Sequence, residues 1–294
     1  MSEKRLAEHL QMVWSNWHSR TNHCKNCPHW GTGGGTNPFY GVGDLSGDFP
    51  TIAFVARDPG PGGEADIPEL ADRENLGLTS DEIERLEAHI ESEYSQSFED
   101  HRHTDIMETG MCNGEYTRTG SPHSPQMKKC AEAFIYDERF EFNIYYTNLK
   151  KCREFDGDET GTGDAISHCQ HYLEGELTEL DPDVIVTLGN EATSSIYDLL
   201  LPEKIKDSLG IHPDVLTDNP SEAKNVSYEA LRLRKAPNDT AIIPSIHFSN
   251  FGRNLNRWVK PRNDHIPDDM TTDEYWNRLV DLSVEFLQSN RFEM

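Results

Sequence analysis

Four of the six cysteines form two pairs whose spacing is suited to binding a metal. Cys24 and Cys27 are two residues apart in a tight turn, and thiolates so spaced can grip one metal ion or one iron-sulfur cluster. Cys152 and Cys169 have sixteen residues between them, too many for a zinc knuckle, so remote segments must converge on one ligand. The set favours a cluster over zinc, and over disulfides or free buried thiols.

The other metal-binding residue types lack such partners. Cys112 and Cys130 have no cysteine at a comparable spacing, and we expect both to be small buried apolar residues. His101 and His103 lie in an acidic stretch without a third ligand at a useful distance, so we expect solvated side chains rather than a metal pair.

A second group of polar residues directly follows short apolar runs. The turn that starts at Arg57 and Asp58 continues with glycines, whose backbone amides can approach a ligand closely. Asn148 follows another run, and its amide can read a donor-acceptor edge such as that of a nucleobase. His247 follows the last run. Each has a purely structural reading as a turn or packing residue, but three together indicate a binding site.

These residues must be positioned by alternating strands and helices. Apolar runs predict four strands, at residues 51–56, 143–147, 183–189 and 241–246. Helical spacing and start signals predict helices at residues 6–17, 124–138, 164–180, 190–201 and about 271–290. This alternation is typical of a buried parallel sheet with helices on both faces, in which ligands bind at the carboxyl ends of the strands.

The length of 294 residues is enough for one large domain, so we expect a single domain over residues 1–294. An acidic insertion at about 62–110 interrupts it, and its only basic residues up to 108 are Arg73, Arg85 and Arg102.

The net charge of -25 and a pI of about 4.8 argue against a nucleic-acid partner, because long-range repulsion opposes a polyanion. High salt would screen that repulsion, so a halophilic source would make the acidic composition compatible with a DNA partner. The low mean hydropathy of -0.72 agrees with a halophilic source. No apolar run reaches the length of a membrane span, and an amphipathic helix stands where a signal core would be. We therefore expect a cytoplasmic protein without a membrane partner, where thiols stay reduced.

Two stretches contain no acidic residue at all, Phe142–Arg153 and Thr240–Asn263. Buried strands in both exclude charge, but that does not explain why the charges that remain are all positive. We expect both stretches to contribute contact surfaces for an anionic partner. Their basic residues are Lys150, Lys151, Arg153, Arg253, Arg257, Lys260 and Arg262.

These residues, taken in chain order, resemble the uracil-DNA glycosylase superfamily, most closely its iron-sulfur-containing family 4. The matching stretches are Cys24 to Pro28, Arg57 to Gly60, Tyr145 to Arg153, Asp181 to Gly189, and His247 with Arg253. The resemblance covers about residues 20 to 260 apart from the acidic insertion, and the Asn148 to Arg153 stretch followed by Cys169 is its most specific part. It implies a three-layer α/β/α domain around a central, mostly parallel four-stranded sheet.

The resemblance also implies an activity, which is hydrolysis of the N-glycosidic bond of uracil flipped out of DNA, in base excision repair. Asn148, Pro59 and Gly60 would contact the base. His123 stands where the family has a stacking phenylalanine, and an imidazole can also stack.

The same resemblance assigns the remaining roles. His247 would stabilise the charge on departing uracil, and Asp58 would orient water or stabilise a sugar cation. Phe251 would act as a wedge in the DNA, while Arg253 and Lys151 would contact it. A structural 4Fe-4S cluster would be held by the cysteines of the two pairs, Cys24, Cys27, Cys152 and Cys169.

Two other readings stay open. One is a member of the same fold that binds nucleic acid or a modified base without cleaving it. The other is a cysteine-metal protein-interaction module, whose acidic surface would meet a protein partner. For the glycosylase we expect a monomer that acts on uracil-containing DNA and meets replication or repair proteins.

Overall fold

The structure is a computed structural model, and it describes residues 5, 6, 9, 12, 13, 16, 21–25, 27, 42–44, 48–57, 124–151, 162–202, 229–248 and 251–291. The chain folds into two compact units. Unit 1 comprises Met1–Val42, Asp58–Arg102 and Thr147–Asp181, and unit 2 comprises Gly43–Arg57, His103–Tyr146 and Pro182–Met294. The predicted acidic insertion lies outside the described residues.

All four predicted strands are present, as β2 (Thr51–Ala56), β3 (Asn143–Asn148), β4 (Val184–Leu188) and β6 (Ala241–Ser245). Two short strands that the sequence did not predict, β1 (Val42–Asp44) and β5 (Arg234–Lys235), extend the sheet to six strands in the order β1-β3-β2-β4-β6-β5. Strands β2, β4 and β6 are parallel, and β5 is antiparallel to β6. Every residue of β2, β3, β4 and β6 is buried, which explains why these strands are mostly apolar and carry no charged residue.

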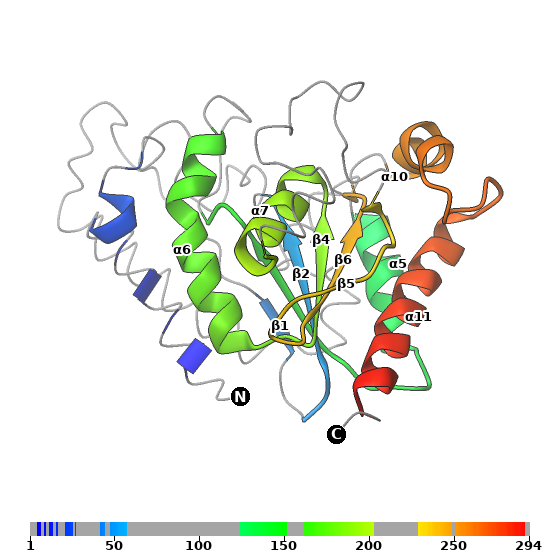
Figure 1. Cartoon of the computed structure of the whole chain (residues 1–294), viewed down its shortest axis with the longest axis horizontal. Coiled ribbons are helices and arrows are strands. Elements are labelled where there is room, and N and C mark those ends of the chain that lie inside the picture. The colour runs from blue at the N-terminus through cyan, green and yellow to red at the C-terminus, as the bar shows by residue number, and fades with distance from the viewer. Residues whose placement is uncertain are drawn as a thin grey trace. The chain divides into compact units, whose positions relative to one another are not determined.

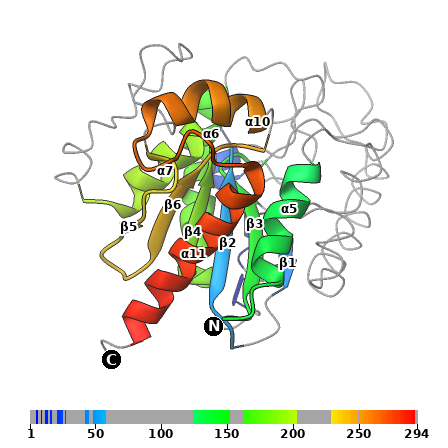
Figure 2. The same cartoon turned by 90° about the vertical axis from the view of Figure 1, so that its right-hand side faces the viewer.

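Helices cover both faces of the sheet in unit 2. Helix α7 (Asn190–Leu200) packs on β4 and β2, while α11 (Thr272–Arg291) packs on β6 and on α5 (Ser124–Ile135). Figures 1 and 2 show α7 on one face and α5 with α11 on the other. A helix-sheet-helix arrangement of this kind confirms the predicted α/β class.

The helix predictions agree closely with the structure. Helices α5, α7 and α11 fall on their predicted segments, as does α6 (Thr162–Leu180) in unit 1. The described residues between 5 and 16 are helical, as predicted. Four short helical elements were not predicted: the 3-10 helix Asn22–Cys24, α10 (Phe251–Asn254), the π-helix Leu255–Val259 and the 3-10 helix Lys260–Arg262. Among the described helices, none is both long and apolar enough to span a membrane.

Asp183, just before β4, joins the amino ends of three strands. Its carboxylate accepts a hydrogen bond from the Thr51 amide at 2.8 Å, and its own amide donates to the Thr51 carbonyl at 3.0 Å. Its carbonyl accepts from the Ala241 amide at 2.9 Å. Because the three strands start in register, Arg57, Gly189 and His247 follow them at the same edge of the sheet.

We expect Asp183→Ala to lower the free energy of unfolding by about 1–2 kcal/mol, because it removes a charge-assisted hydrogen bond to the Thr51 amide. Asp183→Asn keeps an acceptor oxygen at this place and is the matched control, with a smaller loss expected. Denaturant titration of the three proteins measures the difference. Equal losses for the two variants would show that the carboxylate adds nothing to the junction.

Candidate functional site

Of the polar residues predicted at strand ends, Arg57 and His247 lie in described parts of unit 2. His247 follows β6 and is half-buried. Gly189 follows β4 with φ +96°, a conformation that side chains rarely adopt, and a Cβ built on it would lie 3.6 Å from His247 Cβ. The Gly189 amide also donates to the Ser245 carbonyl at 2.9 Å. The glycine therefore lets the β4–α7 turn lie close against the residue that carries the imidazole.

The loop that carries His247 is held by α11. The Tyr275 hydroxyl lies 3.2 Å from Ser245 Oγ and accepts a hydrogen bond from the Ile246 amide at 3.3 Å. Phe248, immediately after the histidine, is buried against Trp276 with ring centroids 5.6 Å apart. His247 is thus fixed on both sides by residues of one helix. Sequence reasoning missed Tyr275 because nothing within α11 marks it as different from other core aromatics.

Phe251 packs into the same aromatic group, 4.5 Å from Trp276 and 5.1 Å from Tyr275 between ring centroids. Its side chain is only 2 % exposed. A wedge that enters DNA must be at the surface, so the structure places Phe251 in the core and not in the predicted wedge position. Arg253, two residues on, is exposed, as a phosphate contact requires.

Asn148, the last residue of β3, is in an unusual environment for an amide. The residue is 0 % exposed, and neither its side-chain nitrogen nor its oxygen has a hydrogen-bond partner among the described residues. A buried polar group left without a partner costs about 1–3 kcal/mol, so native proteins seldom retain one without a reason. The structure therefore marks Asn148 as a group that is completed by something outside the described chain.

In unit 1, a short turn positions the first cysteine pair. The 3-10 helix Asn22–Cys24 begins at Asn22 with φ +48°, and the Asn22 side chain donates to Asn16 Oδ1 at 2.6 Å. The Cys27 amide donates to the Cys24 carbonyl at 3.3 Å, which closes the turn. Both thiols are thereby fixed next to each other and buried.

Cys169 on α6 is also buried, and its sulfur accepts a hydrogen bond from the Lys151 amide at 3.5 Å. Burial is the main cause that raises the pKa of Cys169 to about 11, while the hydrogen bond from the Lys151 amide acts to lower it. The hydroxyl of Tyr172, also on α6, lies 3.5 Å from Cys24 Sγ.

None of these three cysteines forms a disulfide, and neither does Cys130, which is buried as predicted. Within the described part of the chain, no three metal-binding side chains are grouped closely enough to hold a single metal ion. Cys152, the fourth predicted ligand, lies outside the described residues. The chemistry of the three thiols suits an iron-sulfur cluster, whose ligands are cysteine thiolates.

Lys151 does not lie where the DNA-contact prediction requires it. Its side chain is 2 % exposed, and its ammonium group makes an ion pair with Glu176, which is fully buried on α6. Lys151 also donates to Thr147 Oγ1 at 2.7 Å. The ammonium group is therefore part of the interior of unit 1 and not of a surface. The sequence could not reveal this, because the partner lies 25 positions further on.

The other predicted site residues, Asp58, Pro59, Gly60 and His123, lie outside the described residues, as do His101 and His103, which were expected to be solvated.

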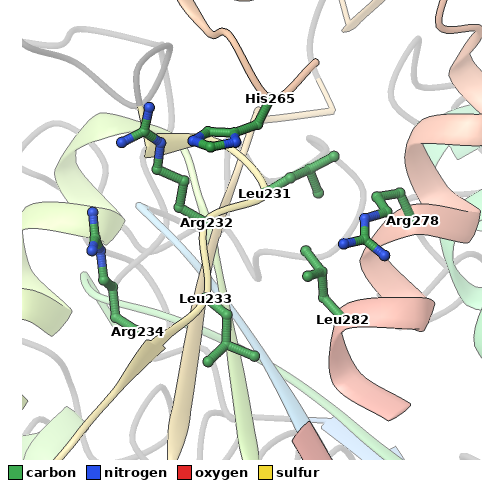
Figure 3. Close-up of a pocket in the computed structure, with 7 residues that line it drawn as sticks. All are labelled: Leu231, Arg232, Leu233, Arg234, His265, Arg278 and Leu282. Carbon is green, nitrogen blue, oxygen red and sulfur yellow. The ribbon is translucent and has the colours of Figure 1, made fainter. Parts of the chain in front are cut away.

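A cavity of about 420 Å³ in unit 2 contains none of the predicted site residues. It lies between the β5 strand and α11, and Figure 3 shows the side chains that line it: Leu231, Arg232, Leu233, Arg234, His265, Arg278 and Leu282. All three of its arginines lie beside carboxylates: Arg232 and Arg234 approach Glu229 at 4.0 and 2.8 Å, and Arg278 pairs with Glu285 at 2.9 Å. Most of the positive charge of this cavity is therefore neutralised within the protein.

We expect Lys151→Met to lower the free energy of unfolding by about 3–5 kcal/mol, because it leaves the Glu176 carboxylate buried without its cation. The double variant Lys151→Met/Glu176→Met should recover most of that loss. Denaturant titration measures both. Loss of DNA affinity with unchanged stability would instead support the surface role that the sequence suggested.

Comparison with known proteins agrees with these features. No curated protein matches the chain. The family model described as "Uracil DNA glycosylase superfamily" matches residues 101–279, which is more than half of the 294 residues. The match includes β3 with Asn148, the cysteine of α6, β4 and its turn, and the His247 loop with α10. The chain therefore belongs to the uracil DNA glycosylase superfamily.

Proposed function

We propose that this protein is a uracil-DNA glycosylase of base excision repair, which hydrolyses the N-glycosidic bond of a uracil flipped out of DNA. Membership of the superfamily supports a glycosylase-like function in general. The observation that carries the finer proposal is the buried amide of Asn148, whose nitrogen and oxygen both lack a partner among the described residues.

An amide offers one donor group and one acceptor next to each other. The edge of uracil presents the complementary pair, a carbonyl oxygen beside a ring N–H. Cytosine presents an amino donor beside a ring acceptor, so an amide held in one orientation distinguishes the two bases. Because Asn148 is buried in the folded protein, its amide loses its bound water when the chain folds and not when the base binds. Hydrogen bonds to a base would then offset the free-energy cost of the unpaired amide.

His247 would act on the departing base. As the glycosidic bond breaks, negative charge develops on uracil, and a fixed N–H donor aimed at that charge lowers the barrier. The Tyr275 hydroxyl and the buried Phe248 hold the loop on both sides of His247, so the donor needs little reorganisation. Asp58 would orient the attacking water, Pro59 and Gly60 would contact the base, and His123 would stack on it.

The proposal includes a structural 4Fe-4S cluster held by Cys24, Cys27, Cys152 and Cys169. The supporting observations are three free, buried thiols and the 3.5 Å approach of the Tyr172 hydroxyl on α6 to Cys24 Sγ in the N-terminal turn. When bound, such a cluster would crosslink these segments of unit 1 and would take no part in the hydrolysis. The residues of the chain alone read the base and stabilise the leaving group.

We expect Asn148→Ala to abolish most uracil excision, and His247→Ala to reduce the single-turnover rate by about 10²–10³. The matched control is Asn143→Ala on the same strand, because Asn143 is also buried but donates to the Phe49 carbonyl at 3.1 Å. It should lose about 1 kcal/mol of stability and keep its rate, whereas Asn148→Ala should keep its stability.

The assay follows abasic product from a uracil-containing oligonucleotide, across a salt series up to molar concentrations. No product from the wild-type protein at any salt would contradict the glycosylase and leave a member of the fold that binds without cleaving. Equal loss of rate in the Asn148 and Asn143 variants would show that Asn148 has no special part in reading the base.

For the cluster, we expect anaerobically purified protein to carry iron and sulfide in equal amounts, with the broad visible absorbance of an iron-sulfur centre. Cys169→Ser should lose both iron and absorbance, while Cys130→Ser, which alters a buried thiol outside the set, should keep them. Stoichiometric zinc in place of iron would contradict the cluster and leave the cysteines as a zinc site.

A further inference from the structure

The surface formed by α10, the π-helix and the 3-10 helix after it has an unusual charge environment. Phe251, Leu255 and Val259 are buried and fix this segment to unit 2. Arg253 and Arg257 are exposed, and Arg262 is half-exposed. We call these three residues the arginine face. The segment is drawn in orange in Figures 1 and 2.

Most of the other arginines whose side chains the structure describes in unit 2 are neutralised by carboxylates. Arg57 pairs with Glu191 at 3.7 Å, Arg139 with Asp137 at 2.6 Å, and Arg278 with Glu285 at 2.9 Å. Arg232 and Arg234 both approach Glu229, at 4.0 and 2.8 Å. With 52 acidic residues against 27 basic ones, such pairing is the expected state of an arginine in this chain.

The arginine face departs from that pattern. Among the described residues, Arg253, Arg257 and Arg262 make no ion pair with a carboxylate. Arg257 and Arg262 lie instead over the ring of Trp258, with guanidinium carbons 4.9 and 5.0 Å from its centroid. Arg262 also donates to the carbonyls of Arg257 and Trp258, at 3.3 and 3.2 Å. An aromatic ring and backbone carbonyls orient a guanidinium group without cancelling its charge.

The π-helix brings these groups together. The Lys260 amide donates to the Leu255 carbonyl five residues earlier, which is the wider turn of a π-helix. Since both guanidinium groups lie on one ring, they are within about 10 Å of each other. Successive phosphates on one DNA strand are separated by 3.4 Å along the helix axis, so two such cations can reach neighbouring phosphates of one strand.

We propose that Arg257 and Arg262, ordered by Trp258, form a contact surface for the phosphate backbone of duplex DNA beyond the His247 loop. This inference rests on the proposed function, because it takes DNA as the partner. The contact positions the protein on DNA of any sequence and does not read the bases. The arginine face would thus make the contact with the DNA phosphates that was predicted for Lys151, which is buried against Glu176.

The test measures binding to a duplex without uracil, by fluorescence anisotropy over a series of salt concentrations. We expect Arg257→Gln/Arg262→Gln to weaken binding about a hundredfold, or roughly tenfold for each charged contact. The slope of log affinity against log salt should change by about 1.8 relative to the wild-type protein. Trp258→Leu keeps both charges, so it should weaken binding less and leave the slope almost unchanged.

The matched control is Arg139→Gln/Arg278→Gln, which removes the same charge from two ion-paired arginines with side chains 43 % exposed. It should bind DNA as the wild-type protein does, and circular dichroism should show both double variants folded. The inference is overturned if the two double variants behave alike, or if wild-type protein binds no duplex at any salt concentration. Duplex binding that depends on these arginines, without uracil excision, would contradict the proposed glycosylase activity but would still support the arginine face as a DNA contact.

Discussion

The arrangement of the unit 2 sheet depends on how its parallel strands start. Asp183 binds the amino end of β2 through its carboxylate and backbone, and that of β6 through its carbonyl. A strand advances by a nearly fixed distance per residue, so strands that start together and have similar lengths end together. The turn after β4 and the His247 loop are therefore brought to one edge by an interaction at the opposite edge, and Gly189 lets them approach closely there.

Sequence predicted the parts of the fold that depend on local pattern. The buried strands and the helices α5, α6, α7 and α11 were found because burial on both faces, or on one helical face, leaves a periodic signal. The environments of Lys151 and Phe251 were not found. Lys151 lies in an acid-free stretch, so it was expected at the surface until the structure placed Glu176 beside it. Phe251 was expected to be a wedge from the family resemblance alone, and its packing against Trp276 has no signal in the local sequence.

Lys151 and Asn148 show how two buried polar groups three positions apart differ in consequence. The charged group has its counter-ion and a threonine hydroxyl within the fold, so it contributes to the structure of unit 1. The neutral amide has no described partner, so it adds an energetic cost that the fold alone does not repay. Buried polar groups that are satisfied stabilise one structure, whereas an amide without a described partner needs a partner from outside the described residues. The sequence alone cannot distinguish the two cases.

The surface arginines whose side chains the structure describes also divide into those with a carboxylate partner and those without one, and the charge of the chain makes this difference important. A net charge of -25 repels DNA at long range, but in molar salt the Debye length falls to about 3 Å and only groups in direct contact interact. Under those conditions net charge has little influence on binding, and affinity depends on whether cations at the contact are already neutralised. The charge of arginines held by a tryptophan ring and by carbonyls is not balanced by an anion among the described residues, whereas that of the arginines beside Glu229 and Glu285 is balanced by a carboxylate. An acidic chain can therefore bind a polyanion through a few cations that are kept away from its own carboxylates.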